Sequence, residues 1–151
     1  MPLTPSDLAT RIAVEDVVVR AFVAADEQDW TTLEDCFADP IVLDMTSMVG
    51  GEPASMAPRE VAVAWAEGFA PLDHVHHQIG NLRTDVQGDR ATVRCYGVAF
   101  HRREAARGVK TRMFVGTYTF DLEASGEAWR IHRLAFHLKF IEGNLELEGE
   151  G

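Results

Sequence analysis

The sequence has few cysteines, no long apolar run and a shortage of basic residues, and each shortage narrows what the protein can be. Its two cysteines, Cys36 and Cys95, are too few for a disulfide framework and do not form a Cys-X-X-Cys pair, so we expect two reduced thiols in apolar surroundings. No apolar run approaches the roughly 18 residues needed to cross a bilayer. The start, Met1 to Asp7, lacks the basic and then apolar pattern of a secretion signal. We therefore expect a cytoplasmic protein with no membrane partner.

Basic residues are outnumbered, because 14 Lys and Arg stand against 24 Asp and Glu and give a net charge of −10. A surface of this charge repels phosphate backbones and anionic lipid, so nucleic acid is not an expected partner. The 151 residues, of which 46% are hydrophobic and 25% charged, have the length and balance of one globular domain. We expect a single domain over residues 1–151 with an acidic tail that frays from about residue 146.

Apolar residues spaced three to four apart predict helices in the first half of the chain. A long helix begins near Thr4 or Ser6, either of which can cap it, and ends near Asp26. After it we predict a short helix over residues 29–38, capped by Asp29, and a strand over 41–45. A loop over 46–56, which could cover a pocket mouth, and a helix over 58–69 that starts with a proline follow.

The apolar period changes to two in the second half, which predicts four strands at 74–86, 91–103, 110–122 and 129–140. Turn residues around Gly88 and Gly126 join the first strand to the second and the third to the fourth as hairpins. Helices followed by a mostly antiparallel sheet make an α+β layout in which the helices cover one face of the sheet.

The first predicted hairpin brings two histidines together. A three-residue turn sets His77 directly opposite His101, and a two-residue turn moves the partner by one position. Counting by twos along the second strand places His101 on one face with Cys95, Gly97 and Ala99. Small side chains beside two imidazoles are what a cavity floor needs, because large ones would fill it.

Asp26 is the candidate partner for these histidines. It follows Phe22 by four residues, so helical geometry places its carboxylate on the apolar stripe that must face the sheet. A carboxylate that fixes the tautomer of an imidazole makes the ring a useful general base. A solvated or helix-capping Asp26 and structural histidines are the alternative interpretations.

Other side chains near the predicted pocket complete the candidate site. His74 and His76 share a strand face and could chelate a metal, but no carboxylate or cysteine stands at ligand spacing, so we predict no metal site. Arg133 on the last strand could point inward and hold an anionic oxygen. The candidate substrate-binding residues are Met45, Trp65, Cys95, Gly97, Ala99 and Arg133.

Three segments resemble SnoaL-like members of the nuclear-transport-factor-2-like superfamily: Ala25 to Trp30 followed by Leu33 and Phe37, the turn from Val86 to Ala91, and Trp129-Arg130-Ile131. This resemblance implies a cone in which N-terminal helices pack on a curved, mostly antiparallel sheet and enclose a pocket. It also implies a homo-oligomer, a dimer or trimer, formed through the sheet.

Within the superfamily the pattern is most similar to the scytalone dehydratases and the hexachlorocyclohexane dehydrochlorinases, which implies a cofactor-free lyase with an Asp–His dyad. Asp26 and His77 match the dyad, and His101 resembles the second pocket histidine of the dehydratases. Ala25 and Met45 stand where the dehydratases carry water-binding tyrosines, which argues against scytalone as the substrate.

We therefore expect a cofactor-independent lyase or isomerase-type enzyme that acts on a small hydrophobic or polyketide-like molecule. His77 would remove a proton beside an electron-withdrawing group, Asp26 would orient the ring, and His101 would donate to the leaving hydroxyl or to the developing enolate oxygen. A polyketide cyclase is an alternative of the same chemical kind. A noncatalytic small-molecule-binding or assembly module is the alternative from another class.

Overall fold

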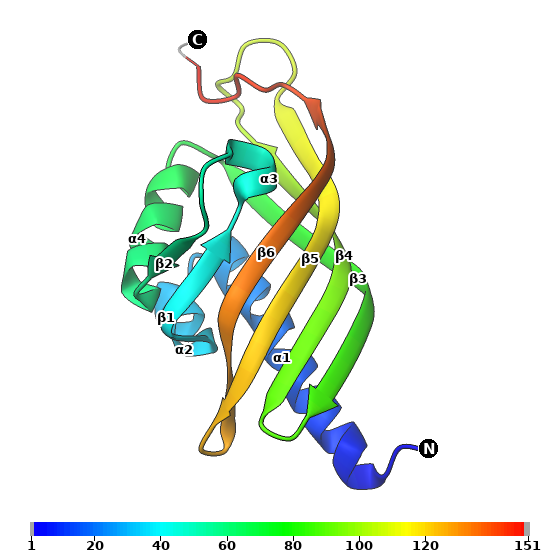
Figure 1. Cartoon of the computed structure of the whole chain (residues 1–151). Coiled ribbons are helices and arrows are strands. Elements are labelled where there is room, and N and C mark those ends of the chain that lie inside the picture. The colour runs from blue at the N-terminus through cyan, green and yellow to red at the C-terminus, as the bar shows by residue number, and fades with distance from the viewer. Residues whose placement is uncertain (1, 150–151) are drawn as a thin grey trace.

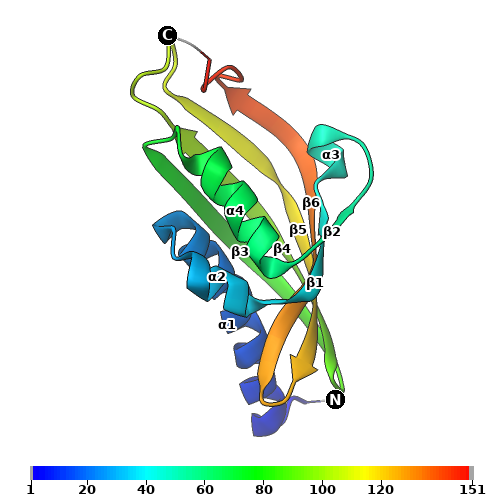
Figure 2. The same ribbon diagram turned by 90° about the vertical axis from the view of Figure 1, so that its left-hand side faces the viewer.

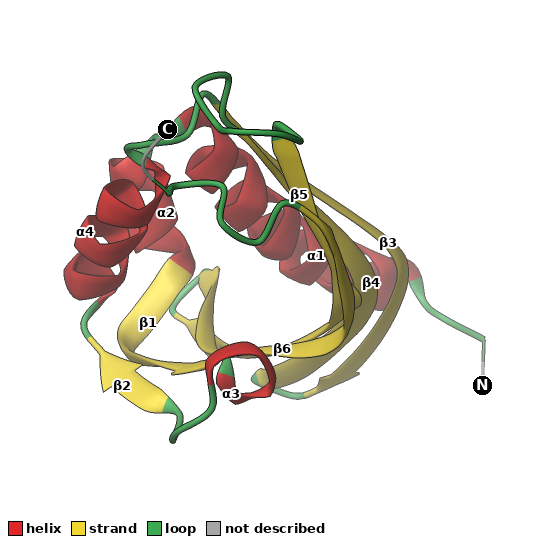
Figure 3. Ribbon diagram, turned by 90° about the horizontal axis from the view of Figure 1, so that it is seen from above, coloured by secondary structure: helices red, strands yellow, loops and turns green. Residues whose placement is uncertain are grey.

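Six strands form one curved sheet in the order β2-β1-β6-β5-β4-β3, and helices cover its concave face (Figures 1, 2 and 3). The computed structural model describes residues 2–149. The elements are α1 (Pro5–Glu27), α2 (Trp30–Cys36), β1 (Phe37–Asp44), α3 (Thr46–Val49), β2 (Ala54–Met56), α4 (Pro58–Phe69), β3 (His74–Gln87), β4 (Arg90–Arg102), β5 (Thr111–Ser125) and β6 (Ala128–Gly143). Only β1 and β6 pair in parallel within the described chain; the other neighbours are antiparallel. The predicted α+β cone is confirmed.

Helix α1 supplies most of the helical contribution to the core. Thr4 caps its start: the threonine side chain accepts from the Asp7 N–H, and the Asp7 side chain accepts from the Thr4 N–H. Gln28 ends it in the left-handed conformation, with φ 57°. The buried stripe points at the sheet and comprises Val14, Val17, Val18, Ala21, Phe22, Ala24 and Ala25. Asp26 is therefore the first polar residue after a buried stripe.

The stretch between α2 and α4 differs most from the prediction. Strand β1 begins at Phe37 instead of Ile41, directly after α2. The predicted loop over 46–56 contains the single turn α3 and the edge strand β2, which pairs with β1 at Met56 and Ile41. Periodicity does not reveal a three-residue strand, because too few positions alternate.

The hairpin of β3 and β4 contains a bulge that the sequence prediction did not include. Next to the turn, Gln87 pairs with Arg90, as a two-residue turn requires. The register then shifts between Gly80 and Arg83, so that Asn81 and Leu82 together oppose Cys95. Asn81 has φ 54°, a left-handed conformation that asparagine tolerates better than most residues.

This bulge determines where the two histidines lie. Beyond it His77 pairs with Ala99, and His101 pairs with Val75. The predicted direct pairing of His77 with His101 is therefore wrong by two positions, but both histidines lie on the same face, as diagonal neighbours. Without the bulge the two-residue turn would have placed them on opposite faces, because side chains alternate along a strand.

The end of the chain is packed against the molecule as far as it is described. Leu147 is fully buried in a small second cluster with Leu72 and Ala106. Arg103 donates to the backbone carbonyls of Leu147 and Gly149. The expectation of a tail that frays from residue 146 is therefore corrected up to Gly149, because an apolar side chain and two backbone carbonyls hold it. Among the described helices, none combines the length and apolar character that crossing a membrane requires.

Candidate active site

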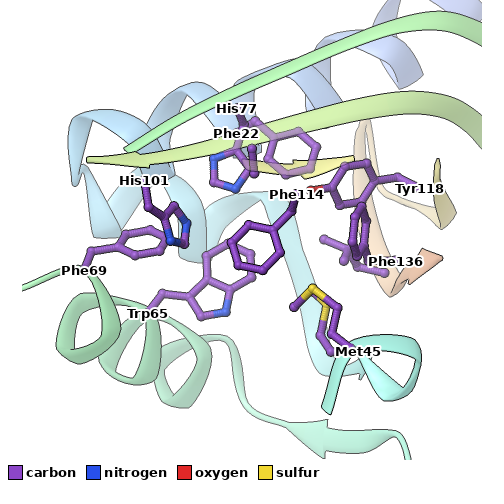
Figure 4. A pocket seen from close by; sticks show the side chains of 12 residues that line it. Phe22, Met45, Trp65, Phe69, His77, His101, Phe114, Tyr118 and Phe136 are labelled. Carbon is purple, nitrogen blue, oxygen red and sulfur yellow. The ribbon is translucent and has the colours of Figure 1, made fainter. Parts of the chain in front are cut away.

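A cavity of about 200 Å³ lies between the concave face of the sheet and the helices α1 and α4. Twelve residues line it: Phe22, Met45, Met48, Trp65, Phe69, His77, Ala99, His101, Phe114, Tyr118, Leu134 and Phe136. Most of these side chains are aromatic or aliphatic. Figure 4 shows the two histidines entering from the sheet side, with Trp65 and Phe69 from α4 and Met45 on another wall. The cavity is thus an apolar chamber with a few polar groups at its edge.

His77 binds both oxygens of the Asp26 carboxylate. Its ring Nδ1 lies 2.6 Å from Asp26 Oδ1, and its backbone N–H donates to Asp26 Oδ2 at 2.8 Å. Both side chains are mostly buried, with 11% of His77 and 18% of Asp26 exposed. Since a carboxylate only accepts, Nδ1 carries the hydrogen and Nε2 keeps its lone pair. In the neutral ring, the contact with Asp26 thus leaves Nε2 as the nitrogen without a hydrogen.

Aromatic packing holds the His77 ring in this orientation. Phe22, one helical turn before Asp26, stacks on the imidazole with 4.9 Å between ring centroids and 22° between planes. Phe69 from α4 also packs near the imidazole, with 6.4 Å between the ring centroids. Helix α1 therefore supplies both the carboxylate that binds the imidazole and the ring that stacks on it.

His101 is held differently, by a cation. Arg112 lies directly opposite on β5 and donates from Nε and Nη2 to His101 Nδ1, at 3.2 and 2.9 Å. Because guanidinium groups only donate, Nδ1 of His101 accepts, and the neutral ring carries its hydrogen on Nε2. Burial first, and then the charges of Arg112 and His77, lower the pKa of His101 from 6.5 to about 4. His101 is therefore a neutral hydrogen-bond donor near pH 7.

The C-terminal segment completes this contact. Both carboxylate oxygens of Glu148 accept from Arg112, one from Nη1 at 2.7 Å and the other from Nη2. Only 14% of the Arg112 side chain is exposed. The hydrogen bonds with Arg112 hold the pKa of the Glu148 carboxyl below its usual range. Glu148, Arg112 and His101 thus form a continuous chain of hydrogen bonds from the C-terminal segment to the cavity.

Tyr118 on β5 adds a third polar group to the cavity wall. The residue is only 6% exposed and lines the cavity. Burial raises the pKa of this phenol, so the hydroxyl stays protonated and can donate. The ring packs between Phe22 and Phe136, at 4.9 and 4.7 Å between centroids.

The structure separates the predicted substrate contacts into two groups. Met45, Trp65 and Ala99 line the cavity. Gly97 and Cys95 lie on the same sheet face but outside the cavity, because the Tyr118 ring fills the space beside them: a Cβ on Gly97 would lie 2.1 Å from Tyr118 Cε2, and Cys95 pairs with Tyr118. Their predicted contact with substrate is corrected for that reason.

Arg133 also lies outside the cavity. The neighbouring Leu134 and Phe136 face the cavity, whereas Arg133 donates from Nη2 to Asp44 Oδ2 at 2.6 Å. The prediction that Arg133 points inward and holds an anionic oxygen of the substrate is therefore wrong. The exposed His74 and His76 lie on the outer face of β3, and no group of three metal-ligating side chains converges within residues 2–149.

Sequence reasoning missed Arg112, Glu148 and Tyr118. The hairpin arithmetic that located the histidines also applies to β4 and β5, where it places Arg112 opposite His101. Tyr118 is equally visible as the residue opposite Cys95. Glu148 gives no such signal, because it follows the last strand and reaches Arg112 only through the fold of the tail.

Comparisons with known proteins show the fold and the family. A SnoaL-like domain model matches residues 6–135. Kfla4162 protein from Kribbella flavida superposes with a TM-score of 0.85 at 23% identity, over 90% of this chain and 95% of that one.

Two further structures agree. A candidate scytalone dehydratase from Novosphingobium aromaticivorans gives a TM-score of 0.81 at 16% identity, over 94% of this chain and 92% of that one. The type 3 hexachlorocyclohexane dehydrochlorinase from Novosphingobium barchaimii gives 0.75 at 16%, over 91% and 92%. The search of curated protein sequences gives no match. The family model covers most of the chain, and the protein therefore belongs to the SnoaL-like domain family.

Proposed function

We propose that the protein is a cofactor-independent lyase or isomerase-type enzyme that eliminates water from a small hydrophobic or polyketide-like carbonyl compound. The observation that carries this proposal is the contact of His77 Nδ1 with Asp26 at 2.6 Å, beside an apolar cavity. A carboxylate in this position fixes the tautomer of the base and stabilises the imidazolium that forms when the base takes a proton.

The proposed reaction needs only the residues of the cavity. His77 Nε2 takes a proton from the carbon beside the carbonyl, and the C–H electron pair moves into the bond that becomes the enolate. The enolate then re-forms the carbonyl and a carbon–carbon double bond as the C–O bond to the β-hydroxyl breaks. The imidazolium of His77 returns its proton to the departing oxygen, so water leaves and the base is regenerated. Hydrogen-bond donors at the carbonyl oxygen of the substrate lower the barrier, because they stabilise the negative charge of the enolate.

The lining indicates the kind of substrate. Five rings, those of Phe22, Trp65, Phe69, Phe114 and Phe136, surround the space above the histidines. Arg112 faces the cavity only through His101, and Glu148 accepts from its guanidinium. We therefore propose an uncharged, flat substrate of one or two rings.

The test is turnover of small aromatic β-hydroxy ketones, followed by the absorbance of the conjugated enone and by loss of 18 mass units as water. We expect His77→Gln to lower kcat/KM at least about 100-fold. His76→Gln is the matched control, because His76 is the adjacent residue on the outer face. A product that keeps the elements of water and gains a carbon–carbon bond would indicate a cyclase, and binding without turnover would indicate a noncatalytic module.

We also propose that the chain forms a homo-oligomer, a dimer or trimer, through the outer face of the sheet. Tyr96 and Phe140 on that face are 54% and 49% exposed, and the less exposed Val98, Phe100 and Val115 lie beside them. Light scattering of the purified chain tests this, with Phe140→Glu expected to give monomers. A wild-type protein that is monomeric at high concentration would rule out the proposal.

A further inference from the structure

Sequence and fold place His101 in the cavity, but the reaction depends on which of two roles it takes. An imidazolium could give a proton to the leaving hydroxyl, whereas a neutral ring can only donate a hydrogen bond, because loss of its remaining proton would make a strongly basic anion. The contacts around His101 distinguish these two states.

We infer that Arg112, held by Glu148, is a positioning residue that keeps His101 neutral with its hydrogen on Nε2, so that His101 binds the carbonyl oxygen of the substrate and does not protonate its leaving group. This inference rests on the proposed elimination for its chemical meaning. The state assigned to His101 can be measured without any substrate.

Geometry is the first support. Two nitrogens of Arg112 reach Nδ1 of His101, at 3.2 and 2.9 Å, so this ring atom has no room for a hydrogen. The ring is packed between Phe69 and Phe114, with centroids at 5.9 and 5.2 Å, and this limits its rotation. The hydrogen on Nε2 is thereby directed away from Arg112.

Charge is the second support. Arg112 on β5 and His77 on β3 disfavour a proton on His101, while Glu148 from the C-terminal segment and Asp26 from α1 favour one. Glu148 is turned toward Arg112 and accepts two hydrogen bonds from it, so the guanidinium stands between the carboxylate and His101. Burial is the largest cause of the lowered pKa of His101, and the charge of Arg112 adds to it.

The two histidines therefore have opposite polarity toward the cavity. His77, with a carboxylate on Nδ1, offers a lone pair at Nε2; His101, with a guanidinium on Nδ1, offers a hydrogen at Nε2. The base, His77, is suited to a C–H beside a carbonyl. The neutral donor on the same sheet face, His101, is suited to the carbonyl oxygen. A neutral imidazole is a better match in acidity to an enolate oxygen than an imidazolium that would transfer its proton outright.

Histidine side-chain ¹H–¹⁵N spectra of the full chain across pH 4 to 8 test the inference directly. In the wild type we expect His101 as the Nε2–H tautomer, neutral from pH 8 down to pH 5. Arg112→Met should raise the pKa of His101, while burial still holds it below 6.5, and should populate the second tautomer. Arg112→Lys keeps the charge and should hold the pKa below that in Arg112→Met. Arg102→Met is the control, since Arg102 lies one residue along β4, is exposed and pairs with Glu104.

A wild-type His101 that carries its hydrogen on Nδ1, or that is protonated at pH 6, would overturn the inference, and so would an unchanged His101 pKa in Arg112→Met. The wild-type spectrum decides the matter even if the variant does not fold. With a substrate in hand, Arg112→Met should lower kcat at least about tenfold and raise the pH below which activity falls. Absence of turnover would refute the proposed function but leave the spectroscopic result on His101 intact.

Discussion

Asp26 and His77 are joined by two contacts, one through the ring Nδ1 at 2.6 Å and one through the backbone N–H at 2.8 Å. The backbone contact is independent of the protonation state of the ring. It holds the carboxylate on β3 whether or not the imidazole is protonated. Pre-arranged groups of this kind lower a barrier because they need not reorganise.

Asp26→Asn tests the tautomer that this contact fixes. The amide oxygen can accept from only one of the two N–H groups comfortably, and the amide NH₂ then faces the other position. We expect a large part of His77 to carry its hydrogen on Nε2, where it cannot act as a base, and kcat to fall by about 10² to 10⁴. Steady-state kinetics provide the measurement. Glu27→Gln removes the same charge one residue later at an exposed position and should leave kcat within twofold.

Phe22 should be among the most sensitive positions for stability. It is 5% exposed and contacts the rings of His77, Tyr118 and Phe120. Phe22→Ala removes these contacts and leaves a cavity, so the free energy of unfolding should fall by about 3 to 5 kcal/mol in urea titrations. Val23→Ala, on the exposed side of the same helix, should change it by no more than about 0.5 kcal/mol. Equal effects at the two positions would be inconsistent with the packing described.

Gly97→Ala tests the contact that keeps Tyr118 in place. The new Cβ would lie 2.1 Å from Cε2 of Tyr118, so the ring must move toward the cavity. We expect a loss of about 1 to 3 kcal/mol in the free energy of unfolding and weaker binding of aromatic ligands. Gly80→Ala is the control on the neighbouring strand: its Cβ meets nothing within 4 Å, and its effect should be neutral or slightly stabilising. Identical stability of the two variants would contradict the assignment.

The depressed pKa of His101 predicts how stability depends on pH. The unfolded chain binds a proton at this residue near pH 6.5, whereas the folded chain does so only near pH 4. Between these values the unfolded state holds more protons, so the free energy of unfolding falls as the pH falls, by about 2 to 3 kcal/mol from this group. His101→Gln should lack this contribution in urea titrations at pH 7 and pH 4.5, and His76→Gln should keep it. The same pH dependence of the free energy of unfolding in His101→Gln and in the wild type would refute this contribution of His101.

The sequence predicted the elements that have clear periods or caps. Helix α4 begins at Pro58 and ends at Phe69 as expected, and the Asp29 cap begins α2. The position of Asp26 followed from helical spacing alone. Hairpin pairing and strand alternation placed the two histidines on one face, although they assumed an unbroken hairpin.

The features that the sequence did not reveal depend on single residues. Some of these residues alter the strand register, and others pack the C-terminal segment against the domain. The bulge at Asn81 and Leu82 leaves no periodic trace, and it alone determines that His77 and His101 share a face. Leu147 gave no helical or strand pattern, yet its burial anchors the segment that carries Glu148. The contact of Arg112 with His101 depends on the register of β4 and β5, which the same pairing arithmetic could have given.

The measurement that tests the central claim most directly is proton exchange at the carbon beside the carbonyl of a bound aromatic ketone in D₂O, followed by NMR. It reports abstraction by the base even where no leaving group is present. Wild-type protein should catalyse incorporation of deuterium, with a rate at least about 100-fold lower in His77→Gln and close to wild type in His76→Gln. Exchange at the same rate in His77→Gln would contradict the assignment of His77 as the base.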